Sequence, residues 1–217
     1  MFKQGQLKSL GIATALIILN IAVMAVFALT PLSAVNDLLF GTFLFLGVIV
    51  YGAMLTGGVW LAKRGVRNGS NTQAIGGTGL IQVAYGMFGA GIIGIYAPEL
   101  QAAALGITGV VTTVIAVLSG LLVFGTSYDF SNWGRYANYI FLGVLAVSFI
   151  GSFSGIFGLI AFTLALIGFI VYLIHQIYMT KTRPNTPFLN GIGLYTAYMG
   201  VFVEILQLVV QMLLARE

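Results

Sequence analysis

Charged residues are scarce in this sequence. Asp, Glu, Lys and Arg make up 6% of its 217 residues, whereas a soluble domain has about 25%. Hydrophobic residues make up 59% of the chain. Such a composition cannot cover a protein surface with polar groups, so we predict an integral membrane protein with little mass outside the bilayer. The length suits one domain, residues 1–217.

Several kinds of functional site need residues that the sequence lacks. The absence of cysteine excludes disulfides, thiolate metal sites and a cysteine nucleophile. His175 is the only histidine, which excludes a histidine-rich metal site. No phosphate loop, dinucleotide fingerprint or HExxH zinc motif occurs, and both aspartates, Asp37 and Asp129, lie between apolar runs. We therefore expect neither an enzyme nor a cofactor.

Long apolar runs dominate what is present. A membrane-spanning helix needs roughly 20 apolar residues. We interpret the first run as a span rather than a cleaved signal peptide, because it is long enough to cross. A Gly/Ser turn over residues 151–158 divides the fifth run from the sixth, which would otherwise make a helix of roughly 67 Å. The expected spans cover about residues 10–30, 39–62, 75–97, 101–125, 136–155, 157–180 and 189–214.

The basic residues predict how these spans are oriented. With seven spans, one side of the membrane receives Lys3, Lys8, Lys63, Arg64, Arg67, Arg135, Lys181 and Arg183. The other side receives Arg216, together with Asp37, Glu99 and Glu217. Positive charge favours the cytoplasmic side, so we expect the N-terminus in the cytoplasm and the C-terminus outside. The fold class is all-α, a seven-transmembrane-helix bundle in the plasma or inner membrane. The net charge of +4 follows from this topology and does not indicate nucleic-acid binding.

Small residues recur at helical spacing within the runs. Gly86, Ala90 and Gly94 form one small-xxx-small pattern, and Gly151 and Gly155 form another at the Gly/Ser turn. Such patterns allow helices to approach each other closely. Helix packing is the simpler interpretation of both patterns, and the lining of a substrate channel is the alternative.

The last apolar run carries a polar stripe. At helical spacing, one face of this run consists of Asn190, Gly193, Ala197, Gly200, Glu204, Gln207 and Gln211. Lipid cannot satisfy polar groups, so this face must look into protein or water. We therefore expect the other spans to pack around this helix.

Glu204 is the one acidic residue that we place inside a span. An intramembrane carboxylate is costly, so the group is protonated, paired or exposed to water. We consider two roles, a proton- or cation-responsive group and a neutral hydrogen-bonding group between helices. Gln207 and Gln211 would extend a polar track from it to the outer surface. His175, near the cytoplasmic end of the sixth span, is a second candidate for pH sensing or, alternatively, a hydrogen-bonding group at a helix end.

The connection after the fourth span is the most distinctive segment. Locally, Asp129 is typical of a turn and cap residue ahead of the fifth span. The segment resembles the Thr-x-x-Asp-Leu-Ser-x-x-Gly pattern of the Bax inhibitor-1 family (transmembrane Bax inhibitor motif, including the bacterial YccA-type members), through Thr126, Asp129, Phe130, Ser131 and Gly134. The last span resembles that family's final helix through Leu194, Tyr195, Tyr198 and Phe202. The similarity covers residues 110–214 and implies a seven-helix bundle.

The resemblance implies a pH-sensitive pair of aspartates that controls a calcium leak. In this sequence the two positions are Ile174 and Ala197, which cannot titrate. Glu204 lies two turns beyond Ala197, and His175 adjoins Ile174, so a displaced pair is one hypothesis. Two functions remain open: a pH-responsive leak for calcium or another cation, and a non-transporting membrane regulator that binds another membrane protein, such as a protease. The lipid bilayer is a partner in both.

Overall fold

The structure is a computed structural model that describes residues 3–35, 38–39, 44–94, 96, 98–153 and 155–215. Its described residues form long α-helices and no strand. Seven of these helices are long and apolar enough to cross a membrane. The prediction of an all-α protein with seven helices able to span a membrane is therefore confirmed. The helices are α1 (Gln4–Ala28), α3 (Leu44–Arg67), α4 (Asn71–Ile93), α5 (Pro98–Gly125), α6 (Trp133–Gly151), α7 (Gly155–Thr182) and α8 (Pro187–Leu214), with a short 3-10 helix, η1 (Pro31–Ala34), after α1.

The helix ends follow local chemistry more than hydropathy. Ser70 caps α4, its hydroxyl accepting a hydrogen bond from the Gln73 amide, so the helix begins at Asn71 rather than near residue 75. Proline is tolerated at the start of a helix, where no amide hydrogen is needed. Pro98 and Pro187 are the first residues of α5 and α8, and Pro31 begins η1. The expected break between the fifth and sixth spans lies between Gly151 and Gly155.

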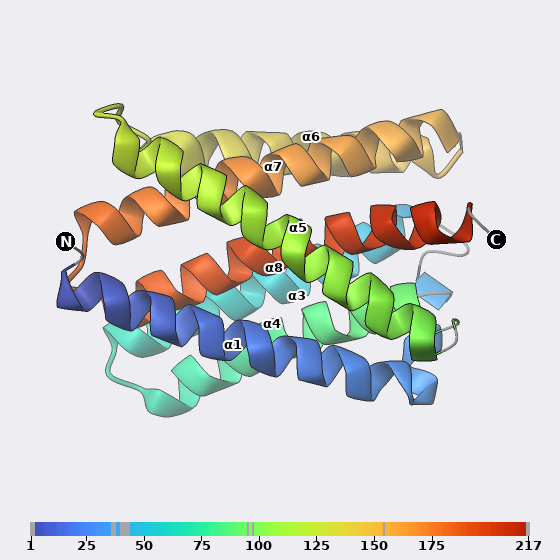
Figure 1. Ribbon diagram of the computed structural model, residues 1–217, viewed down its shortest axis with the longest axis horizontal. Helices are drawn as coiled ribbons and strands as arrows, with labels where there is room; N and C mark the ends of the chain where they lie inside the picture. The colour runs from blue at the N-terminus through green and yellow to red at the C-terminus, as the bar shows by residue number, and fades with distance from the viewer. Residues whose placement is uncertain are drawn as a thin grey trace.

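α8 is the central helix of the bundle. Nearly every residue from Asn190 to Val210 is buried, whereas α4 is about half buried and the other five spans keep a broad exposed apolar face. Figure 1 shows α5 crossing in front of α8, with α6 and α7 along one side and α1 along the other. The expectation that the other spans pack around the last one is met, and the polar stripe on its sequence is the reason that it could be foreseen.

Close helix contacts occur where residues are small. A Cβ on Gly86 would lie 2.7 Å from the Val23 side chain of α1, and Met24 of α1 packs against Gly89. Ala90, one turn further, is fully buried, and Gly94 caps the end of α4. In the α6–α7 hairpin, a Cβ on Gly151 would lie 2.9 Å from the amide of Gly158, whereas the space around Gly155 is open. The close approach in this hairpin is therefore made at Gly151.

Polar side chains inside the bundle join α1 to α4. The Asn20 side-chain amide donates to the Gln82 backbone carbonyl at 2.8 Å and to its side-chain oxygen at 2.7 Å. Gln82 donates in turn to the Leu16 carbonyl at 2.9 Å. In an apolar environment such groups must find partners within the protein. These two residues therefore fix the register of α1 against α4.

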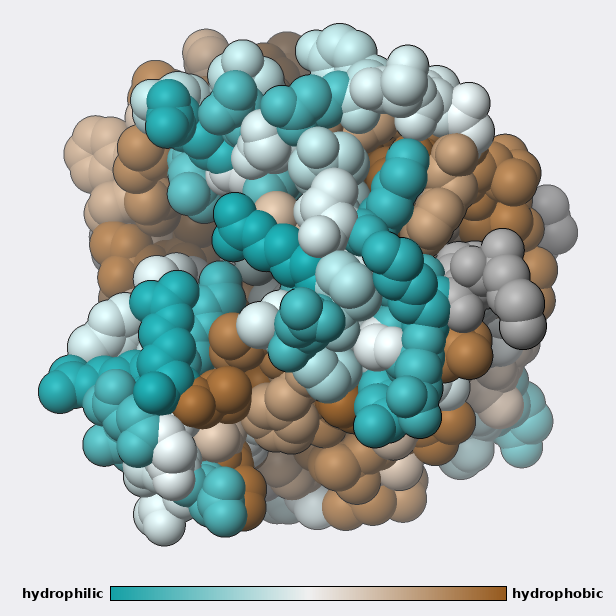
Figure 2. Space-filling model, turned by 90° about the vertical axis from the view of Figure 1, so that its left-hand side faces the viewer, coloured by the Kyte–Doolittle hydropathy of each residue, from teal (hydrophilic) through white to brown (hydrophobic). Residues whose placement is uncertain are grey.

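The basic residues gather at one end of the bundle, which we call the basic end. The N-terminus, the α3–α4 turn, the α5–α6 loop and the α7–α8 connection all lie there, and the C-terminus lies at the other end (Figure 1). Figure 2 views this end, where hydrophilic residues cover most of the surface. The basic end carries Lys3, Lys8, Lys63, Arg64, Arg67, Arg135, Lys181 and Arg183. Asp37, Arg216 and Glu217, expected at the opposite end, lie outside the described residues.

Candidate functional site

Glu204 lies in the half of α8 away from the basic end, and its side chain is only 7% exposed. In the part of the chain that the structure describes, its carboxyl group forms no hydrogen bond and no ion pair. Removing an unpaired carboxylate from water is expensive, so burial at this position favours the neutral, protonated form.

Tyrosine side chains accompany Glu204 inside the bundle. Tyr85 of α4 is buried and donates its hydroxyl to the Thr196 carbonyl of α8 at 2.7 Å. It interacts electrostatically with Tyr195, with Tyr172 and with Glu204. The hydroxyl of Tyr195 is buried and has no partner among the described residues. These tyrosines add polar groups to the interior, because each side chain combines an apolar ring with a hydroxyl group at its tip.

Three polar side chains on one face of α8 become more exposed toward the end of the helix. Glu204 is buried, Gln207 is half-buried and Gln211 is exposed, and all three share one face of the helix. Successive residues at this spacing are about 5 Å apart along the axis. Along this face, the exposure of the three polar side chains therefore increases from the interior toward the end of the bundle opposite the basic end.

The same face is closed on the other side of Glu204. One turn toward the basic end, the ring of Phe169 from α7 packs directly on Gly200, leaving no room for a Cβ there. Phe169 is backed by Phe141 of α6, with ring centroids 4.8 Å apart. Two turns further, the side-chain amide of Gln176 packs on Gly193 in the same way. The small residues of the stripe are visible in the sequence, but the side chains that fill the space beside them, Phe169 and Gln176, belong to another helix.

His175 belongs to a different part of the molecule. Its Nδ1 lies 3.1 Å from the Phe130 carbonyl oxygen, which can only accept, so Nδ1 carries the hydrogen. Its ring also packs on Gly134, where a Cβ would lie 2.7 Å from Nε2. The structure thus brings His175 together with the segment that resembles the Bax inhibitor-1 motif. Neighbouring Gln176 meets α8 at Gly193, and Glu204 is 11 residues beyond, or roughly 16 Å along the helix.

Asp129 makes a turn within that segment. Its carboxylate accepts a hydrogen bond from the Ser131 amide at 2.8 Å and another from the Tyr178 hydroxyl of α7. The hydrogen bond from the Ser131 backbone, followed by those from the side chains of Ser131 and Tyr178, lowers the pKa of Asp129 below its usual value. The N-cap position of α6 is Asn132, so the expectation that Asp129 also caps the helix is wrong. Asp129 stabilises the turn that precedes α6, and the N-cap position follows three residues later, at Asn132.

The two positions at which the resembled family has aspartate are apolar and buried. Ile174 lies in a small cluster with Val123 and Phe130 at the basic end. Ala197 is fully buried in the main core. No group of three His, Cys, Asp or Glu residues that could hold a metal ion occurs in the described ranges. The site therefore consists of one buried carboxyl group, its polar track and the aromatic ring that closes it.

The chain matches no protein-family model, no curated protein and no solved structure.

Proposed function

We propose that this multispan membrane protein is a pH-responsive cation leak whose proton-binding group is Glu204. The observation that carries the proposal is the unpaired, buried carboxyl group at the inner end of the track formed by Gln207 and Gln211. Intramembrane acids without a structural partner mark ion or proton pathways. The N-terminus and the basic end would face the cytoplasm, by the positive-inside rule.

In this proposal, the described conformation is the closed state of the leak. Protonated Glu204 carries no charge, and Phe169 fills the space next to Gly200 on the side of the basic end. Loss of the proton would leave a carboxylate that the closed interior cannot stabilise. Among the described residues, Tyr85 of α4 is the titratable residue that interacts with Glu204, and a tyrosine supplies no positive charge to neutralise the carboxylate. Hydration of the track and displacement of Phe169 would relieve this cost, so flux is expected to rise with pH.

Flux into proteoliposomes tests the proposal. We expect Ca²⁺ or K⁺ entry that increases as the pH on the Gln211 side is raised, and that disappears in Glu204→Gln. The matched control is Glu99→Gln, the same chemical change at an exposed glutamate in the first turn of α5. A purified protein without flux, or a flux that Glu204→Gln leaves unchanged, would contradict a leak through this track.

A second candidate function is a non-transporting regulator of another membrane protein. The burial of Glu204 and the apolar residues Ile174 and Ala197 favour it, because a neutral glutamic acid in a dry bundle is a purely structural group. This function predicts no flux at any pH and a defined partner. A photo-crosslinking residue placed at exposed Tyr128, in the α5–α6 loop, should then capture one membrane protein in cells. The control position is Tyr139, which is exposed on the lipid-facing side of α6.

A further inference from the structure

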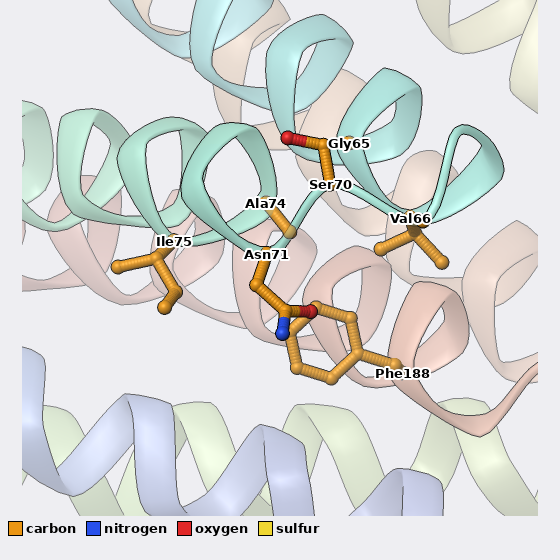
Figure 3. A pocket seen from close by; sticks show the side chains of 8 residues that line it. Gly65, Val66, Ser70, Asn71, Ala74, Ile75 and Phe188 are labelled. Carbon is orange, nitrogen blue, oxygen red and sulfur yellow. The ribbon is translucent and has the colours of Figure 1, made fainter.

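An apolar pocket opens at the basic end, away from Glu204. Its volume is about 360 Å³, at the lower end of the range for small-ligand sites. Figure 3 shows Val66, Ile75 and Phe188 around it, from the end of α3, the first turns of α4 and the first turn of α8. Ile75 is 69% exposed and Phe188 is 38% exposed, so the pocket is open to its surroundings. We call it the Phe188 pocket; it is lined by Gly65, Val66, Gly69, Ser70, Asn71, Ala74, Ile75 and Phe188.

Positive charge beside this pocket is not neutralised by the protein. Lys63 and Arg67 are four residues apart on α3, so they lie on one face of the helix and repel each other. No acidic side chain pairs with either of them in the described part of the chain. Asp129, the one described acid at this end, bonds instead to Ser131 and Tyr178. Arg67 is exposed and is the last residue of α3, and in the chain it lies between Val66 and Gly69, which both line the pocket.

Basic residues at this end are expected from topology alone. Exposed apolar side chains are expected wherever a span meets lipid, but neither expectation requires an apolar recess at the end of α3, beside these charges. Figure 2 shows apolar surface reaching into the hydrophilic end of the molecule. A soluble anion would use the charges and leave Ile75 and Phe188 without a partner. A molecule with both an apolar chain and a negative group, at the depth of the membrane surface, would use both.

We propose that the Phe188 pocket binds an anionic phospholipid, with part of an acyl chain against Ile75 and Phe188 and the headgroup phosphate at Arg67. Basic pockets between membrane helices are suited to acidic headgroups. The phosphate would also relieve the repulsion between Lys63 and Arg67. The site is independent of Glu204, so it stands whether or not the chain conducts ions.

Native mass spectrometry of the detergent-solubilised protein tests this site. The probes are phosphatidylglycerol and phosphatidylcholine with identical acyl chains, so that only the headgroup charge differs. We expect the wild-type chain to retain phosphatidylglycerol in preference. Arg67→Gln should weaken phosphatidylglycerol binding about fivefold, the effect of one basic contact near a membrane surface. Arg135→Gln, a control at the same end on α6, should leave it unchanged.

A second variant tests the pocket itself. Ile75→Glu places an acid in the lining and should abolish the retention of phosphatidylglycerol. Leu7→Glu is the control, because Leu7 is exposed at the same end on α1 and does not line the pocket. If Ile75→Glu fails to fold, Ile75→Ser provides the same comparison with a neutral side chain. Equal retention of the two lipids would overturn the proposal, and so would equal losses in Arg67→Gln and Arg135→Gln or in the Ile75 and Leu7 variants.

Discussion

At Gly200 a single missing Cβ lets α7 approach α8. The ring of Phe169 occupies the space that any larger residue would need. Gly200→Ala should lower the free energy of unfolding by about 1–3 kcal/mol, the usual cost of overpacking a core. Thermal unfolding of the protein in detergent measures this loss of stability. Gly106→Ala is the control, because open space surrounds Gly106 and alanine favours a helix.

A double variant separates packing from backbone effects at this contact. In a Phe169→Leu background, the smaller side chain leaves room for the added methyl group. Gly200→Ala should then cost less than it does beside the native ring. An equal cost in both backgrounds would mean that Phe169 is not what limits the size of residue 200.

The hydrogen bond between Asp129 and the Ser131 amide should depend on pH. This hydrogen bond lowers the pKa of Asp129 in the folded protein. The bond is therefore fully present at any pH above the pKa of about 4 that Asp has in the unfolded chain. The hydrogen bond is lost as the pH falls through the lowered pKa that Asp129 has in the folded protein. Hydrogen exchange at Ser131, corrected for intrinsic rates, should show protection at pH 6 that disappears below about pH 3. Asp129→Asn cannot titrate, so any protection of the Ser131 amide in that variant should be the same at pH 6 and at pH 3; a pH dependence that persists in the variant would contradict this explanation.

At the scale of the element, α7 holds the end of α5. The Lys181 ammonium group donates to the carbonyl of Val123 at 2.7 Å and to that of Thr126 at 3.3 Å. The last carbonyls of a helix have no partner within it and carry partial negative charge. A lysine from another helix thus completes α5 and ties it to the basic end of α7.

Replacing this lysine should loosen the α5–α6 loop. We expect Lys181→Met to lower the free energy of unfolding by about 1 kcal/mol, as for other cations at helix ends. It should also increase proteolysis between residues 126 and 132. The control is Lys8→Met, because Lys8 is an exposed lysine at the same end. Equal effects of the two substitutions would show that net charge matters and the capping contact does not.

These contacts also show which elements the sequence can predict. Hydropathy located the seven spans because each must present an apolar surface to lipid. The helix ends were displaced by several residues, because α1 begins at Gln4 and α4 at Asn71, within polar sequence that hydropathy excludes. The contacts of Lys181 with Val123 and of His175 with Phe130 join residues 58 and 45 positions apart. Such pairs depend on which helices become neighbours, and no periodicity within one helix carries that information.

For the whole molecule, the absence of cysteine makes the orientation directly testable. A cysteine introduced at Glu99, in the first turn of α5, should react with a membrane-impermeant maleimide on intact cells. Ser127→Cys, in the loop at the basic end, should react only after the cells are permeabilised. Both positions are exposed, so reactivity reports the side of the membrane rather than burial. The reverse pattern would place the N-terminus and the basic end outside.

Only part of the candidate site could be predicted from the sequence. Glu204 and its glutamines stand out in the sequence as polar residues in an apolar run. The ring of Phe169, the hydroxyl groups of Tyr85 and Tyr195 and the pocket beside Phe188 do not, because aromatic residues are ordinary in such a run. Their roles arise from packing between helices that are distant in the chain.

The central position of α8 has a consequence for how the protein is made. Translation proceeds at about 5–20 residues per second, so α8 leaves the ribosome on the order of 10–40 seconds after α1. Until then, the six earlier helices have no partner for the faces that α8 later covers. Glu204 and its polar stripe therefore enter the bilayer only after these six helices. Biogenesis should therefore depend on a membrane chaperone that shields the unfinished assembly, and nascent chains that stop before residue 187 should be its natural clients.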